Sequence, residues 1–142
     1  MKEESFFLRL KSEHEAFEAA RREIVSSSSK AQSASKRAIF AILCDDDALA
    51  KALLTEAEDC FEAIGKQAEK NPRLAYEGSY RAALEEYAEA RLVTHIAWKG
   101  SVIPLDGLDE ETHIAGLCDA IGEIVRLMTY RVTDGRDSDA RY

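Results

Sequence analysis

The chain has 142 residues and a formal net charge of −8. This length suits one domain with a single core, which excludes a second, independent catalytic domain. Two prolines, seven glycines and many Ala, Leu, Glu, Lys and Arg residues favour long helices, and the acidic balance excludes the uniformly basic surface of the simplest nucleic-acid binders.

The first predicted element is one long helix over roughly residues 4–44. Small or apolar residues recur there at every seventh position, at Leu10, Phe17, Ile24, Ala31 and Ala38. The phase is unchanged across the serine run at residues 26–29, which a flexible linker would have no reason to preserve. We therefore expect the helix to continue through the serines.

Residues 21–37 of this helix form a basic stretch in an acidic chain. Its cations are Arg21, Arg22, Lys30, Lys36 and Arg37, and its only acid is Glu23. The stretch therefore carries +4, five cations less one acid, and the remainder of the chain carries −12. We expect Arg21, Arg22, Lys36 and Arg37 to contact nucleic-acid phosphate; the open alternative is that they only solvate a long helix.

Two further helices are predicted next. Residues 45–47 are all aspartates, which are expected to end the first helix and to cap the second, over about residues 47–70. Pro72 is expected to begin a third helix that continues to Lys99, since proline is favoured in the first turn of a helix.

Glycine and proline at residues 100–107 mark a loop before a fourth helix at about residues 109–132. No segment sustains an alternation of polar and apolar residues, so the predicted class is all-α, an antiparallel helical bundle with a long first helix. The helical domain is expected to span residues 1–132, and residues 133–142 are expected to form a disordered tail.

Two glutamates interrupt the apolar stripe of the third predicted helix. The stripe follows steps of four, three, four and three through Ala82, Glu86, Glu89, Val93 and Ile96. Burying an unpaired carboxylate costs several kcal/mol, so acids at these positions should be paired, protonated or bound to a metal.

Asp119 and Glu123 lie along one side of the fourth predicted helix, where Gly116, Ala120 and Gly122 allow another helix to approach. The neighbouring positions are expected to face the core: Leu117, Ile121, Ile124 and Met128. Two such acid pairs on packed helices would form an oxygen cage for Mg²⁺ or Mn²⁺, which prefer carboxylate ligands. The spacing also leaves open that these acids are solvated or form salt bridges with Arg91, Lys99 or Arg126.

At these residues the chain resembles translin and translin-associated factor X, including their archaeal relatives. Residues 84–90, LEEYAEA, resemble the family segment LQEYVEA, and residues 116–126, GLCDAIGEIVR, resemble its segment GLxDLxGELxR. Shorter matches at residues 22–24 and 35–39 resemble the long first helix of the family. The similarity covers most of residues 20–131.

The resemblance implies an α-helical fold that forms hollow oligomers, binds RNA or single-stranded DNA and, in the factor X-like members, hydrolyses RNA with Mg²⁺ held by acids. Glu86 and Glu89 match the two glutamates of the motif, and Asp119 matches its catalytic aspartate. Glu123 matches a nearby glutamate and would complete the metal site. The expected function is therefore nucleic-acid binding with Mg²⁺- or Mn²⁺-dependent endoribonuclease activity on single-stranded RNA.

Two other functions remain open. A non-catalytic oligomer that binds single-stranded nucleic acid would keep the acids as structural groups. The other is an all-α nucleoside triphosphate pyrophosphohydrolase, because Glu85, Glu86 and Glu89 fit its EExxE pattern. This function is less favoured, because only half of the expected pattern is present. The downstream pair, Asp119 and Glu123, departs from its ExxD pattern in order and spacing.

Cys44, Cys60 and Cys118 show no CxxC spacing, which favours a reducing, cytoplasmic location over a disulfide framework. The first residues carry acids where a signal peptide needs bases, and no segment approaches the ~18 apolar residues of a membrane span, so we expect no membrane partner. Long helices with aromatic stripes present more apolar surface than four helices can bury, so we expect a homo-oligomer.

Overall fold

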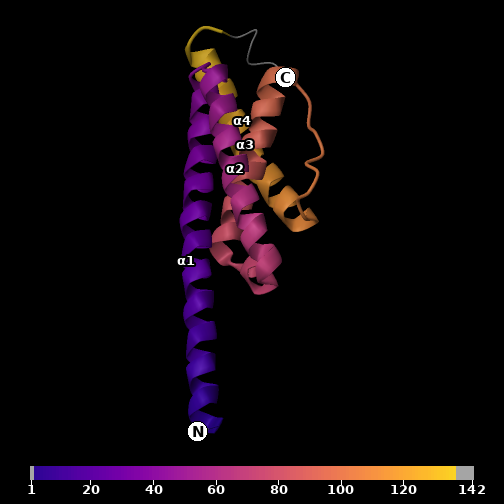
Figure 1. Ribbon diagram of the computed structural model, residues 1–142. Helices are drawn as coiled ribbons and strands as arrows, with labels where there is room; N and C mark the ends of the chain where they lie inside the picture. Colours follow the sequence, from indigo (N-terminus) through magenta and orange to yellow (C-terminus); the bar gives the residue numbers. More distant parts are fainter. Residues whose placement is uncertain (1, 137–142) are drawn as a thin grey trace.

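The computed structural model describes residues 2–136 of the chain (Figure 1). Its elements, in chain order, are α1 (Lys2–Leu43), α2 (Asp47–Lys70), the 3₁₀ helix η1 (Pro72–Tyr76), α3 (Gly78–Lys99) and α4 (Glu110–Thr133). This part of the chain contains no strand, and the all-α prediction is confirmed. No helix within it is long and apolar enough to cross a membrane.

α1 is continuous through the serine run, as its seven-residue phase predicts. Ser28 and Ser35 are buried, and the hydroxyl of Ser35 donates a hydrogen bond to the carbonyl oxygen of Ala31 at 2.9 Å. Ala31 and Ala38 are fully buried, and their small side chains let neighbouring helices pack closely on α1. Leu10 is 50% exposed, because the first part of α1 projects past the bundle (Figure 1).

Asp45 and Asp46 separate α1 from α2, as predicted. Asp45 has a φ of 57°, in the left-handed region that Asp tolerates better than most residues, and α1 ends before it. The carboxylate of Asp46 accepts a hydrogen bond from the backbone N–H of Leu49 at 3.0 Å. This cap satisfies one of the free amides in the first turn of α2.

The prediction of a single helix from Pro72 onward is wrong. The chain forms η1 first and then leaves helical geometry at Glu77, with φ −63° and ψ 127°, before α3 begins. Leu74 of η1 is fully buried against Ile24 of α1 and Ile64 of α2. This tertiary contact stabilises η1 as an element separate from α3, although the sequence pattern favours one continuous helix.

The junctions from α1 to α2 and from α2 to α3 reverse the chain, as an antiparallel bundle requires, whereas α4 runs in the same direction as α3 (Figure 1). The loop at residues 100–109 carries the chain back along the bundle before α4 begins. Arg81 near the start of α3 pairs with Glu111 near the start of α4, with 2.6 Å between Nη2 and Oε2. α1 and α4 both pack against α3, so α3 lies between them.

Only the first residues of the predicted tail are described. Thr133 ends α4, and Nη1 of Arg136 lies 2.8 Å from Oδ2 of Asp45 at the end of α1. Residues 137–142, to which the prediction of disorder extends, lie outside the described part of the chain.

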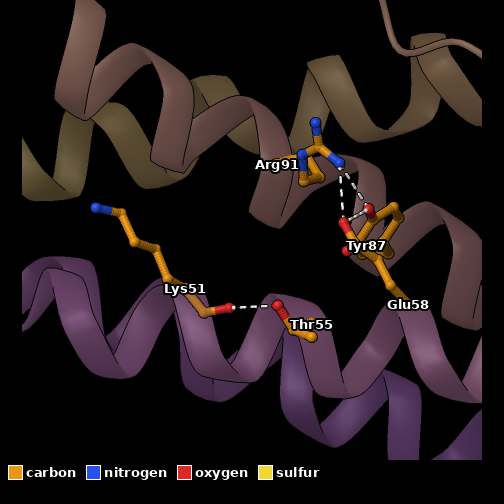
Figure 2. Close-up of polar contacts among 5 residues, drawn as sticks. All are labelled: Lys51, Thr55, Glu58, Tyr87 and Arg91. Atoms are coloured by element: carbon orange, nitrogen blue, oxygen red, sulfur yellow. Dashed lines mark hydrogen bonds and ion pairs between the residues drawn. The ribbon is translucent and has the colours of Figure 1, made fainter.

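Tyr87 and Arg91 of α3 form hydrogen bonds with Glu58 of α2 (Figure 2). The hydroxyl of Tyr87 donates to Oε1 of Glu58 at 2.5 Å, and Nη1 of Arg91 donates to the same oxygen at 3.1 Å and to the Tyr87 hydroxyl at 2.7 Å. Burial, together with the bond to Glu58, raises the pKa of Tyr87 to about 12. Because this face of α3 is turned toward α2, Glu86 and Glu89 on its other side are turned toward α1 and α4.

Candidate functional site

A cavity of about 330 Å³ lies where α1, α3 and α4 meet. Three of the predicted acids line it, namely Glu86 and Glu89 from α3 and Glu123 from α4. The remaining walls are formed by Lys36, Ile39, Phe40, Leu43 and Arg126. Asp119 does not line the cavity, but its charge acts on both Glu86 and Glu89. We call this space and the four carboxylates the acid cavity.

α4 can place its acids beside Glu89 because it packs directly on the backbone of α3. A Cβ atom at Gly116 would lie 2.6 Å from Cβ of Ala88 and 2.9 Å from the backbone nitrogen of Glu89, closer than real atoms approach. Ala120, one turn later on α4, is fully buried in the same core as Ala88. Small residues at this contact therefore bring Glu123 into the same cavity as Glu89.

Two cations partly neutralise the acid cavity from its rim. Nζ of Lys36 lies 3.5 Å from Oε2 of Glu86, and Nη1 of Arg126 lies 3.3 Å from Oε2 of Glu123. The two acidic side chains are only 18% and 24% exposed, whereas those of the two cations are 62% and 61% exposed. Because the cations lie mostly in water, leaving the pair costs them little, whereas the partly buried acids then need another cation in their place.

Glu89 lacks such a cation. No hydrogen bond or ion pair links its carboxylate to another residue in the described range. Burial, followed by the charges of Glu86, Asp119 and Glu123, raises the pKa of Glu89 to about 7. Burial also raises the pKa of Glu86, although the neighbouring Lys36 opposes that shift. Near neutral pH, Glu89 is therefore divided between its protonated and ionised forms.

The four acids share this region without converging on one point. Among the side chains that the structure describes, no three His, Cys, Asp or Glu residues are grouped closely enough to hold a metal ion. Glu86 and Glu123 are turned toward their cations, and Asp119 is exposed. The donor set nevertheless suits Mg²⁺ or Mn²⁺, because all four groups are carboxylates carried by helices. Holding an ion there requires Glu86 and Glu123 to exchange their cations for the metal.

The predicted phosphate-binding cations are spread along α1. Lys36 lines the acid cavity, and Arg37 beside it is exposed. Arg21 lies farther toward the N-terminus, where its Nε is 2.7 Å from Oε1 of Glu77, and Arg22 next to it is exposed. Of the four predicted cations, Lys36 alone is placed at the cavity.

Phe40 and Arg126 line the acid cavity; the sequence did not single out Phe40, and it offered Arg126 only as a possible ion-pair partner of the acids. Phe40 follows Lys36 by four residues, and Arg126 follows Glu123 by three. These spacings put each residue on the same helix face as its predecessor. The signal was therefore present once Lys36 and Glu123 had been singled out.

Comparison with known proteins identifies solved structures with a similar fold. No family model and no curated protein matches the chain. The crystal structure of apo-NeC3PO matches with a TM-score of 0.78 and 25% identity, covering 91% of this chain and 69% of that chain. AfC3PO in complex with duplex RNA matches with a TM-score of 0.81 and 22% identity, covering 99% and 71%. The crystal structure of AfC3PO matches with a TM-score of 0.79 and 22% identity, covering 99% and 73%.

The chain therefore has a translin-like, all-helical fold, and the resemblance to the translin family is confirmed at the level of the fold. The solved structures that it resembles include those of NeC3PO and AfC3PO, which are translin-type complexes.

Proposed function

We propose that the chain binds RNA and cuts single-stranded RNA with Mg²⁺ or Mn²⁺ held by Glu86, Glu89, Asp119 and Glu123. The observation that carries the proposal is the acid cavity itself: Glu86 and Glu89 of α3 and Glu123 of α4 line one space, and the charge of Asp119 acts on both α3 acids. Such crowding of partly buried carboxylates is costly and is typical of sites that serve a cation or a reaction. The fold shared with AfC3PO, which is solved with duplex RNA, supports RNA as the partner.

The charge balance explains how an acidic cavity can accept a polyanion. Without a metal, four carboxylates outnumber the two rim cations, Lys36 and Arg126, and the cavity repels phosphate. Mg²⁺ or Mn²⁺ would supply an activated water there and neutralise the charge that develops on the phosphodiester. When Glu86 and Glu123 serve the ion, Lys36 and Arg126 are released from their pairs and can hold the phosphates of the strand.

Cleavage of end-labelled single-stranded RNA by isosteric variants tests the proposal. Glu86→Gln, Glu89→Gln and Asp119→Asn keep the size of each side chain and remove its charge. We expect each to lose more than about 100-fold in rate with Mg²⁺, because even groups that only orient metal ligands cost about 10–100-fold. Glu85→Gln is the matched control, since Glu85 precedes Glu86 on α3 but does not line the cavity.

The control variant should cut RNA at the natural rate. Equal rates for the natural chain and every variant would overturn the nuclease proposal. Absence of cleavage by the natural chain with Mg²⁺ or Mn²⁺ present would overturn it as well.

A non-catalytic RNA-binding protein is the second candidate. It is favoured by the pairs Lys36–Glu86 and Arg126–Glu123, which satisfy two of the acids without a metal. In that case the affinity for single-stranded RNA, measured by fluorescence anisotropy, should be the same in EDTA and in Mg²⁺. The nuclease proposal instead expects binding that strengthens with the metal.

We also propose a homo-oligomer in the cytoplasm. Apolar side chains that are 49–65% exposed lie on the projecting part of α1 and on the outer side of α4: Phe6, Phe7, Leu8, Leu10, Ile114, Ile121 and Val125. Ile121 was expected to face the core, and that prediction is wrong. Covering these surfaces with further copies of the chain would remove them from water. All three cysteines are free thiols, which fits a reducing compartment.

A further inference from the structure

The acid cavity adjoins a second, more apolar space at the C-terminal ends of α1 and α4. This space has a volume of about 200 Å³ and is lined by Phe40, Leu43, Cys44, Arg126 and Tyr130. Phe40, Leu43 and Arg126 also line the acid cavity, so the two spaces share a wall. We call the second space the aromatic hollow. None of its lining residues is an acid.

Phe40 and Tyr130 both line this hollow and leave large ring surfaces in water. Phe40 of α1 is 61% exposed and Tyr130 of α4 is 53% exposed. Leaving apolar surface in water costs about 25 cal/mol per Å² relative to burying it, so a ligand that covers both rings gains binding free energy. The two rings come from helices that are far apart in sequence, which makes the hollow a product of the folded chain.

The chemistry of the aromatic hollow matches a nucleobase. Its walls offer ring faces for stacking and one guanidinium, Arg126, which can stack on a base or hold the phosphate beside it. The hollow is smaller than the about 300–1,000 Å³ of sites for drug-sized ligands. Its few polar side-chain groups favour a flat ring that is recognised by stacking more than by a fixed pattern of hydrogen bonds.

We infer that the aromatic hollow binds one base of the RNA strand, stacked on Phe40 and Tyr130, next to the phosphodiester at the acid cavity. This inference rests on the proposed function, because the neighbouring acid cavity supplies the reason for a strand to be there. A base can enter the hollow only when it is unstacked and unpaired. The hollow therefore selects single strands, because a base inside a duplex must first be extracted at a cost of a few kcal/mol.

Two oligoribonucleotides of equal length and equal phosphate count test the base site. One carries a single 2-aminopurine among abasic residues, and the other is abasic throughout. With Ca²⁺ as the divalent ion, the natural chain should bind the base-bearing strand about 5- to 150-fold more tightly, the equivalent of the ~1–3 kcal/mol of one base–aromatic stack. Binding should also quench the fluorescence of the 2-aminopurine.

Phe40→Ala should lose both the preference and the quenching, and Phe40→Tyr should restore both. Tyr76→Ala is the matched control, because Tyr76 is an 81% exposed ring on η1 that lies outside the hollow. It should keep both signals. Since Phe40 is exposed, Phe40→Ala should keep the circular dichroism of the natural chain.

A base preference that survives in folded Phe40→Ala would overturn the inference, and so would a natural chain without any preference. If light scattering shows that Phe40→Ala dissociates an oligomer while no base preference exists, a second copy of the chain covers the hollow instead. Failure of the proposed function is separable. If Phe40→Ala loses the base preference but the natural chain does not cut RNA, the base site is supported and the nuclease proposal is overturned. If the natural chain cuts RNA in a way that depends on Glu89 but shows no base preference, the nuclease proposal is supported and the base site is overturned.

Discussion

Replacing Glu89 by Gln should stabilise the metal-free protein at high pH. The pKa of Glu89 is about 7 in the folded chain against an ordinary 4.5, because of burial first and of the neighbouring acids second. With the folded pKa raised, the contribution of Glu89 to stability is fully present below pH 4.5 and is lost as the pH rises through 7. This difference corresponds to about 3 kcal/mol, which the partial exposure of the side chain reduces to roughly 1–3 kcal/mol.

Urea unfolding of the metal-stripped chain at about pH 4 and about pH 8 measures the effect. Glutamine cannot ionise, so Glu89→Gln should match the natural chain at the lower pH and exceed its free energy of unfolding by ~1–3 kcal/mol at the higher pH. Glu85→Gln should follow the natural chain at both. If Glu89→Gln is no more stable than the natural chain at the higher pH, burial and the neighbouring carboxylates do not destabilise the ionised form, and the reasoning is refuted.

Three further predictions concern the packing, the phosphate contact and the assembly. Gly116→Ala should lower the free energy of unfolding by about 1–3 kcal/mol, because its Cβ would lie 2.6 Å from that of Ala88. Gly122→Ala, with nothing within 4 Å, should raise it by about 0.5–1 kcal/mol, and thermal unfolding that ranks the two alike would contradict the close contact. Lys36→Ala should weaken the binding of RNA of any sequence. It should also lower by about 1 the slope of the logarithm of affinity against the logarithm of salt concentration, measured by fluorescence anisotropy. An unchanged slope would show that Lys36 does not contact the RNA. Light scattering should report a multiple of 15.8 kDa, and a clean monomer at micromolar concentration would disprove the oligomer.

Helix boundaries could be predicted where short-range signals decide them. The phase from Ile24 to Ala38 continues across the serines, and Asp46 needs only a backbone amide three residues away to cap α2. Leu74 shows the limit of such signals, because its burial against two other helices breaks the third predicted helix. The direction of α4 is likewise set by the path of the loop at residues 100–109, which no local pattern encodes.

The acids could be singled out because carboxylates in an apolar stripe are expensive, as at Glu86 and Glu89. The distances between helices could not be predicted from the sequence. The exposure of Asp119 and the aromatic hollow beside Phe40 are therefore seen only in the folded chain. Ile121 was misplaced for a related reason. α4 contacts α3 through small residues such as Gly116, which leaves other faces of the helix uncovered.

Calorimetric titration of the metal-stripped chain with Mn²⁺ tests most directly whether the acid cavity holds a divalent cation. We predict saturable binding by the natural chain and by Glu85→Gln, and its loss in Glu89→Gln. Near neutral pH about half a proton should be released for each ion bound, because Glu89 must lose its proton to become a ligand. Titrations in two buffers of different ionisation heat measure that release. Absence of saturable binding by the natural chain, or equal binding by Glu89→Gln, would contradict the metal site.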